Sequence, residues 1–210
     1  MSLIYIAELN PSKDELLAAW IPRQPWAMNS DTSGLERVGA YRFDDPAGAV
    51  GVETHLLRSA SDTVFQVPLT YRSEPLDGAD AYVVGTTDHS ILGKRWVYDG
   101  AGDPVYVSVT VHAIVDSAQQ AELIVESDGV RSIGEATASV HGSGTGDIDP
   151  GPPDNAIVEH KGSRTTVKTA RFILTVHRVI DAKSTEEPQL SGTWTGQESV
   201  STLVVLAPPA

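Results

Sequence analysis

The stretch from residue 63 to residue 72 constrains the fold most, because apolar side chains occupy every second position in it. The apolar positions are Phe65, Val67, Leu69 and Tyr71. A period of two is that of a β-strand with one buried face and one solvated face. Pro68 has no backbone N–H to donate, so we expect this strand to lie at a sheet edge or to carry a bulge there.

Two further strand-like runs come before this strand, over residues 37–44 and 50–58, and a turn at 45–48 separates them. Three strands joined by short connections make an antiparallel meander. The sequence therefore predicts an antiparallel sheet as the centre of the N-terminal half.

A short strand over residues 3–9 and one helix are predicted ahead of this meander. Ser12 and Glu15 have the spacing of a capping box, in which each side chain binds the backbone N–H of the other residue. Pro22 ends the helix, whose apolar face would cover one face of the meander. A polar loop follows over residues 29–34.

A second helix is predicted over residues 104–117. Asp103 and Pro104 are typical of an N-cap and a first helical residue. Four valines that alternate with other residues argue for a strand instead, since β-branched residues disfavour helices: Val105, Val107, Val109 and Val111. We expect the helix, and we expect the preceding polar segment, residues 86–104, to be a turn-rich connection.

The remainder of the chain alternates short strand-like runs with glycine-containing turns. The expected strands cover residues 122–126, 136–141, 156–160, 165–181 and 200–206. We expect a mobile loop over residues 142–155 and a charged loop over residues 183–188.

These elements indicate an α+β fold with mainly antiparallel sheets and about two helices. We expect residues 1–121 to form one α+β region. Residues 122–210 are expected to form a β-rich region that packs on the first sheet or extends it.

Charge and composition exclude several classes of partner. The net charge of −13 opposes binding to nucleic acids and to anionic membranes, and favours solubility or a basic partner. The absence of cysteine excludes disulfides, thiolate catalysis and cysteine-bound zinc. No secretory signal and no apolar run of about 20 residues is present, so we expect a cytoplasmic protein.

Several short motifs together resemble the N-terminal cap of actinobacterial maltokinases. The segment Ile21-Pro22-Arg23-Gln24-Pro25-Trp26 is similar to a Leu-Pro-Arg-Gln-Arg-Trp-Phe segment of that family. Gln66-Val67-Pro68-Leu69 resembles its Gln-Val-Pro-Leu strand. Val97-Tyr98-Asp99, followed by Asp103-Pro104, resembles its Val-Tyr-Asp and Asp-Pro steps. The resemblance spans roughly residues 10–115, and it extends to small stand-alone cap-like proteins that are sometimes labelled as glucan-branching proteins.

The resemblance implies a cap-like fold and a place in maltose, trehalose and glycogen metabolism. It does not imply catalysis, because no His-x-Asp catalytic loop and no magnesium-binding motif follows, and phosphoryl transfer needs both. The family's Gly-Lys after the Trp-Phe pair is also missing here, where Ala27-Met28-Asn29 follows Trp26. We therefore expect a non-catalytic interaction or regulatory module, with a protein of α-glucan or trehalose metabolism as its partner. An unpaired edge strand would also permit a homodimer.

One alternative is a small-molecule or carbohydrate-binding protein with no cofactor and no metal, and a third is an unrecognised enzyme. The candidate ligand-binding residues are Trp26, His89, Arg95 and Trp96, because tryptophan stacks on sugars and arginine binds anions. The competing interpretation makes Trp96 a core residue and pairs Lys94 and Arg95 with nearby acids such as Asp99 and Asp103.

Other catalytic and metal-binding patterns are weaker. Asp88-His89-Ser90 cannot be a catalytic triad, because triad members converge from separate segments, so we expect a polar turn in which His89 bonds the backbone. The six histidines lack metal-ligand spacing, and the glycine-rich segment 142–146 lacks the ending of a phosphate loop.

Overall fold

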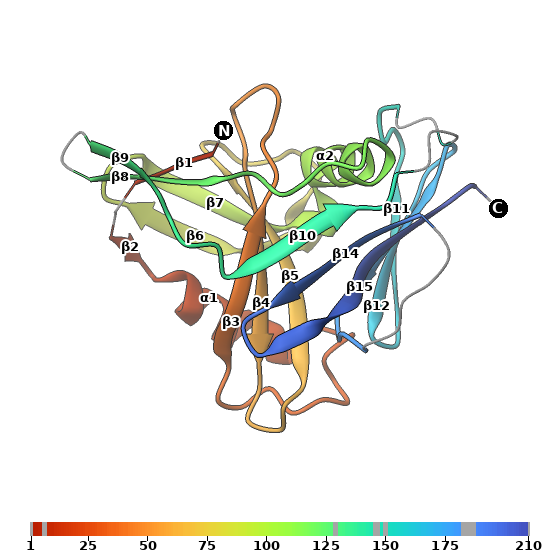
Figure 1. Cartoon of the computed structure of the whole chain (residues 1–210), viewed down its shortest axis with the longest axis horizontal. Helices are drawn as coiled ribbons and strands as arrows, with labels where there is room; N and C mark the ends of the chain where they lie inside the picture. The colour runs from red at the N-terminus through yellow and green to blue at the C-terminus, as the bar shows by residue number, and fades with distance from the viewer. Residues whose placement is uncertain are drawn as a thin grey trace.

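The computed structural model describes residues 2–5, 8–127, 130–144, 148, 151–181 and 188–209 of the 210-residue chain. Its described part contains two α-helices and two six-stranded antiparallel sheets, which confirms the α+β expectation (Figure 1). A smaller sheet has the order β1-β8-β9, in which β1 and β8 run parallel. Its strands are β1 (Ser2–Tyr5), β8 (Leu123–Ser127) and β9 (Val130–Ile133).

The N-terminal sheet has the order β2-β6-β7-β5-β4-β3. Its strands are β2 (Leu9–Asn10), β3 (Glu36–Arg42), β4 (Gly51–Arg58), β5 (Val64–Arg72), β6 (Val83–His89) and β7 (Gly93–Asp99). The predicted meander is confirmed as β3-β4-β5. The segment 86–104, predicted to be turn-rich, instead forms most of a hairpin of β6 and β7, with its tip at residues 90–92.

The C-terminal sheet has the order β10-β14-β15-β13-β12-β11. Its strands are β10 (Ala138–Gly142), β11 (Ile157–Lys161), β12 (Arg164–Lys168), β13 (Ile173–His177), β14 (Gln189–Trp194) and β15 (Gln197–Ala207). The run 165–181 is divided into β12 and β13, and β9 and β14 were not predicted. Much of the two predicted loops lies outside the described residues, which omit 145–147, 149–150 and 182–187.

Both predicted helices are present. In α1 (Lys13–Trp20), Ser12 and Glu15 form the expected capping box, and a 3₁₀ turn that contains Pro22 (Ile21–Arg23) follows. In α2 (Pro104–Val115), the Asp103 side chain accepts from the N–H of Val105, as an N-cap does. Shorter 3₁₀ turns cover Asp80–Tyr82 and Gly100–Gly102.

Helix α2 forms although its valines alternate like those of a strand. Buried residues lie almost all around it, at Tyr106, Val107, Val109, Thr110, Val111, Ala113 and Ile114. A helix that is apolar on most sides is stable when other elements enclose it. Packing therefore outweighs the modest helix penalty of the β-branched residues.

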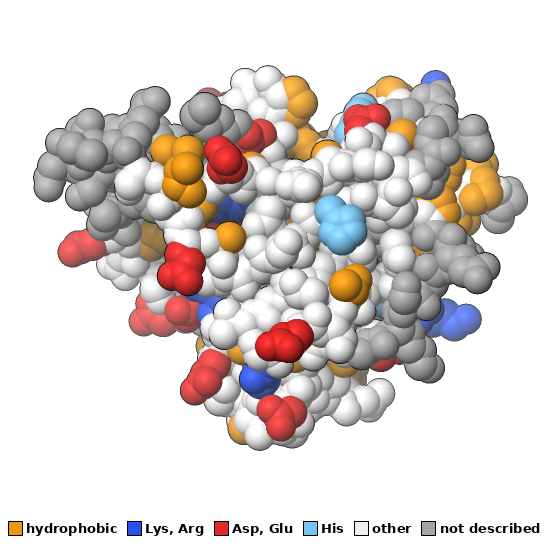
Figure 2. Space-filling model, in the orientation of Figure 1, with side chains coloured by type: hydrophobic (Ala, Val, Ile, Leu, Met, Phe, Trp, Pro, Cys, Tyr) orange, Lys and Arg blue, Asp and Glu red, His pale blue; other side chains and the backbone are white. Residues whose placement is uncertain are grey.

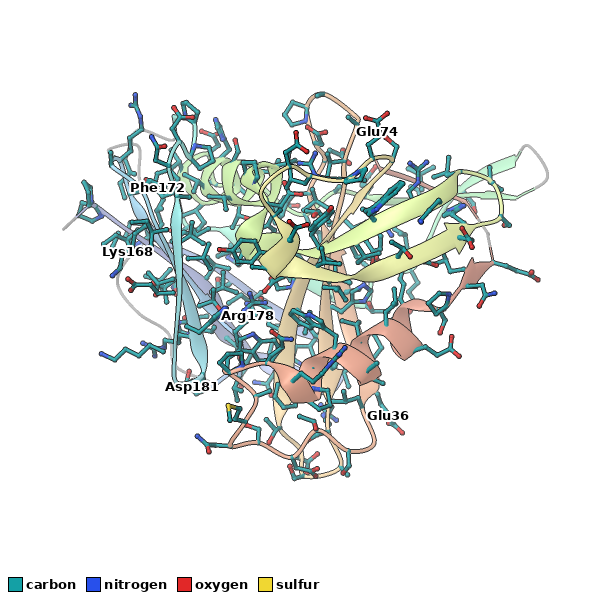
Figure 3. All side chains as sticks on the ribbon, turned by 180° about the vertical axis from the view of Figure 1, so that it is seen from behind. Glu36, Glu74, Lys168, Phe172, Arg178 and Asp181 are labelled. Carbon is teal, nitrogen blue, oxygen red and sulfur yellow. The ribbon has the colours of Figure 1, made fainter. Side chains whose placement is uncertain are left out.

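Two hydrophobic cores flank the N-terminal sheet. The inter-sheet core joins one face of this sheet to α2 and to the C-terminal sheet, with members such as Leu56, Tyr106 and Leu174. The α1 core lies on the opposite face, where Leu17 and Trp20 of α1 pack with Phe65 and other residues of the sheet. Figure 3 shows α1 lying across that face, on the side away from the C-terminal sheet.

Pro68 does not mark an edge strand, because β5 lies between β4 and β7. The missing N–H nevertheless falls where β5 changes partner on one side. Gln66 donates there to the carbonyl of Arg178, whereas pairing with β7 begins at Leu69. The proline therefore occupies a gap in the ladder of an interior strand, which a local pattern does not distinguish from an edge.

Candidate functional site

Trp26, the first of the predicted ligand-binding residues, is buried in the α1 core. Its ring centroid lies 5.8 Å from that of Trp20 and 6.1 Å from that of Phe65. The guanidinium of Arg178 lies 5.1 Å from the centre of the same ring. Trp26 therefore packs in the interior and presents no ring face to solvent.

His89 ends β6 and shapes the tip of the hairpin, which confirms the expected polar turn. Its Nδ1 accepts hydrogen bonds from the backbone N–H groups of Ile91, at 3.2 Å, and Leu92, at 3.1 Å. Burial lowers the pKa of His89, and the nearby charges of Arg95 and Lys13 lower it further. Because Nδ1 is occupied as an acceptor, the proton of the neutral ring is on Nε2, which is thus a donor.

Arg95 and Trp96 are consecutive residues of β7, so their side chains point to opposite faces of the sheet. Arg95 pairs across the hairpin with Thr87, two residues before His89, and therefore shares a face with both. Val97, two residues farther along, is fully buried in the α1 core, so this is the α1 face. Trp96 is on the other face, where the Lys94 ammonium lies 4.9 Å from its ring centroid.

The structure thus brings His89 and Arg95 together and places Trp26 and Trp96 elsewhere. The competing interpretation named the wrong ion-pair partners. Asp99 pairs with Arg178, and Asp103 pairs with Arg72, at 2.7 Å in each case. Both carboxylates are buried, so neither is a surface partner for Lys94 or Arg95.

A cluster of ionisable side chains that sequence reasoning missed lies on the same α1 face, around Glu53 of β4. One carboxylate oxygen of Glu53 lies 3.0 Å from Arg42. The other oxygen lies 2.5 Å from Lys13, 3.2 Å from His55 and 3.2 Å from the hydroxyl of Tyr71. The ammonium of Lys13, the first residue of α1, also lies 5.1 Å from the centre of the Tyr71 ring.

Burial and mutual charge set the protonation states in this Glu53 cluster. Burial raises the pKa of Glu53, but His55, Arg42 and Lys13 outweigh it and hold that pKa well below the usual value. Burial lowers the pKa of His55 more than Glu53 raises it, so the ring is neutral near pH 7. Burial, reinforced by the negative charge of Glu53, holds the pKa of Tyr71 well above its usual value.

The Glu53 carboxylate is a poor general base, because it is ionised, weakly basic and already accepts from four donors. Its arrangement instead ties the start of α1 to β3, β4 and β5. Burial also lowers the pKa of Lys13. The cluster therefore fixes the position of a cation, Lys13, which also acts on His89.

A third polar group lies inside the molecule, where the two sheets meet. The fully buried guanidinium of Arg178 binds both carboxylate oxygens of Asp99 at 2.7 Å and donates to Thr165 at 2.8 Å. Figure 3 shows Arg178 in the interior between the strands of the two sheets. The ion pair connects β7 of one sheet to the chain just after β13 of the other, so its role is structural.

Two further structural findings bear on function. Among the described residues, no group of three or more His, Cys, Asp or Glu side chains is arranged to hold a metal ion. Within the same residues, no helix has the length and apolar character needed to span a membrane.

Residues 20–103 match the family model of the maltokinase N-terminal cap domain, which confirms the resemblance over that segment. The segment runs from the last residue of α1 to the N-cap of α2 and contains β3 to β7. It therefore holds His89, Arg95 and Glu53 but not Lys13. No curated protein matches the chain.

Proposed function

With the cap-domain match over residues 20–103 as the premise, we propose that this protein is a non-catalytic interaction or regulatory module of maltose, trehalose and glycogen metabolism. That match is the observation that carries the proposal. Its partner is an enzyme of this metabolism.

The packing of the matched segment supports this role. Hydrophobic cores cover much of both faces of the N-terminal sheet, one beneath α1 and one against α2 and the C-terminal sheet, which leaves the sheet edges and the end of the β6–β7 hairpin for contact with a partner. At the tip of the β6–β7 hairpin, Ile91 is 56% exposed and Leu92 is 45% exposed. Acidic side chains are scattered over the face drawn in Figure 2, in keeping with the net charge of −13. Such a surface favours a partner with a basic face.

The test is sedimentation velocity of the full chain mixed with purified enzymes of this metabolism, a maltokinase catalytic domain without its cap and a trehalose synthase. A stoichiometric complex with one of them is expected. The double variant Ile91→Ser/Leu92→Ser should weaken the complex at least about tenfold if the hairpin tip lies in the contact. Val200→Ser is the matched control, because Val200 is 51% exposed but lies outside the matched segment.

Two results would overturn the proposal. One is the absence of a complex with either enzyme at micromolar concentrations. The other is turnover of maltose, trehalose or a nucleotide by the purified chain alone.

A second candidate function, small-molecule binding, is favoured by one observation, the convergence of His89 and Arg95 on the α1 face near Lys13. These groups offer donors and no nucleophile–base pair, an arrangement suited to holding a ligand. A rise in thermal stability with maltose, trehalose, a sugar phosphate or a nucleotide would support this function, since a ligand stabilises the state that binds it.

A further inference from the structure

We propose that the α1 side of the β6–β7 hairpin is an anion-binding site, in which the Arg95 guanidinium and the Nε2–H of His89 bind a phosphate group or a phosphate ester. The inference rests on the second proposed function, small-molecule binding, and assigns the chemical class of its ligand. It also moves the site away from Trp26 and Trp96.

The strand register brings the two donors to one face. His89 and Thr87 are two residues apart on β6, and Arg95 lies directly across from Thr87 on β7. Neighbours of this kind on one face of an antiparallel pair have their Cβ atoms within about 8 Å. The turn fixes the His89 ring through Nδ1, and the proton on Nε2 is then a donor in a fixed direction.

Arg95 brings a positive charge to the α1 face of the hairpin although the chain as a whole is acidic. Arg95 forms no ion pair with any described residue, and it is only half-buried. The only acidic residue of the hairpin near its tip, Asp88, faces away, because it pairs with Lys94 on the opposite face. On the α1 face, Glu53 and Asp14 are already bound by Lys13 and Arg37.

The Arg95 guanidinium and the His89 imidazole N–H lie on a face of the hairpin that carries no acidic side chain near its tip, and such a pair of donors favours an anion. Burial lowers the pKa of His89, and the charges of Arg95 and Lys13 lower it further, so both cations add positive potential at the ring. Arginine binds a phosphate with two parallel N–H···O bonds, and the imidazole N–H adds a third donor. The anchoring of Lys13 by Glu53 and of His89 by the turn means that little ordering is needed on binding.

The chain offers a matched control for this site. Lys94→Gln and Arg95→Gln remove one positive charge each at adjacent positions, but on opposite faces of β7. Both variants change the net charge equally, so they separate a defined site from general attraction of anions to the hairpin.

The experiment is a titration of the full chain with inorganic phosphate and with glucose 6-phosphate, and glucose is the neutral control. Binding is measured by calorimetry and by the change in the NMR signals of the His89 ring. We expect both anions to bind and to shift the His89 signals. Arg95→Gln should weaken binding about tenfold or more, His89→Gln should weaken it severalfold, and Lys94→Gln should change it less than about twofold. Circular dichroism and the melting temperature establish that each variant is folded.

The inference is overturned if neither anion binds, or if Lys94→Gln weakens binding as much as Arg95→Gln does. Binding of glucose or of a neutral disaccharide without binding of the anions would overturn the anion site alone and leave small-molecule binding standing. Binding of inorganic phosphate and glucose 6-phosphate with equal affinity would show that the phosphate group by itself is recognised. Tighter binding of the ester would show that the site also contacts the sugar.

Discussion

Replacement of Arg178 by methionine would test whether the buried ion pair connects the two sheets as described. The substitution keeps most of the side-chain length but removes the guanidinium, which makes two bonds of 2.7 Å to Asp99 and one of 2.8 Å to Thr165. Among the described residues, the Asp99 carboxylate, whose side chain is 3% exposed, would then keep only the backbone N–H of Ala101 as a donor. Solvent therefore cannot replace the lost partner.

Breaking a buried ion pair by removing one member costs about 3–5 kcal/mol, because the remaining charge is left without compensation. For a chain of this size, each kcal/mol lowers the melting temperature by about 2–4 °C, so we expect a decrease of about 6–20 °C. Replacing both members with apolar residues removes the stranded charge. The double variant Arg178→Met/Asp99→Leu should therefore be less destabilised than the sum of the single variants.

Urea unfolding followed by tryptophan fluorescence and by circular dichroism measures these free energies. Trp26 reports on the site itself, since Arg178 lies over its ring. A loss below about 1 kcal/mol in Arg178→Met, or simple additivity in the double variant, would refute the reasoning. Lys168→Met is the control, because Lys168 forms an exposed ion pair with Glu159, and exposed pairs contribute about 0–1 kcal/mol.

Two further predictions concern packing and pH. A Cβ on Gly142 would lie 1.9 Å from the carbonyl oxygen of Ala113, which belongs to the backbone of α2, so Gly142→Ala should lower the free energy of unfolding by about 1–3 kcal/mol or more. In the control variant Gly51→Ala, the new Cβ would have no neighbour closer than 3.5 Å, so the free energy of unfolding should change little. Equal urea midpoints for the two variants would contradict this expectation. The free energy of unfolding should also fall as the pH is lowered from 7 to 5.5. Burial lowers the pKa of His55 in the folded chain, whereas a histidine in the unfolded chain has a pKa of about 6.5, so the unfolded chain binds the extra proton in this range. The contribution of His55 to stability is thus present above its pKa in the unfolded chain and is lost as the pH falls. His55→Gln should reduce the slope of the unfolding free energy against pH. A wild-type slope of zero or of opposite sign would contradict the lowered pKa of His55.

Local sequence signals predicted the elements that depend on short-range physics. The capping box of Ser12 and Glu15, the N-cap at Asp103 and the alternation over residues 63–72 act within a few residues of one another, so their effects can be recognised before the fold is known. The turn role of His89 belongs to the same group, because its two hydrogen bonds reach only residues 91 and 92.

Local signals were insufficient wherever a residue's role depends on a distant partner. Pro68 was predicted to lie at an edge or a bulge, yet it lies in an interior strand. It occupies a gap in the hydrogen-bond ladder, between the residue that pairs with Arg178 and the residues that pair with β7. The valine alternation of α2 was ambiguous because its burial depends on two sheets that come from both halves of the chain.

The candidate site shows the same division. Sequence alone selected His89 and Arg95, because a histidine, an arginine and a tryptophan in one short segment stand out in an acidic chain. The separation of Arg95 from Trp96 follows once the segment is known to be a strand, since consecutive side chains of a strand point to opposite faces. Glu53 and His55 carried a weaker signal, two ionisable groups two residues apart in a strand with a buried face.

The amino-acid sequence by itself determined where helices begin, which strands have a buried face and which family the segment 20–103 resembles, because these properties arise from neighbouring residues. Tertiary structure alone decided that Arg178 pairs with Asp99, 79 residues away, and that Lys13 pairs with Glu53, 40 residues away. A charge that loses its water on burial needs an opposite charge beside it, and which charges are buried together is a property of the assembled sheets and not of either segment.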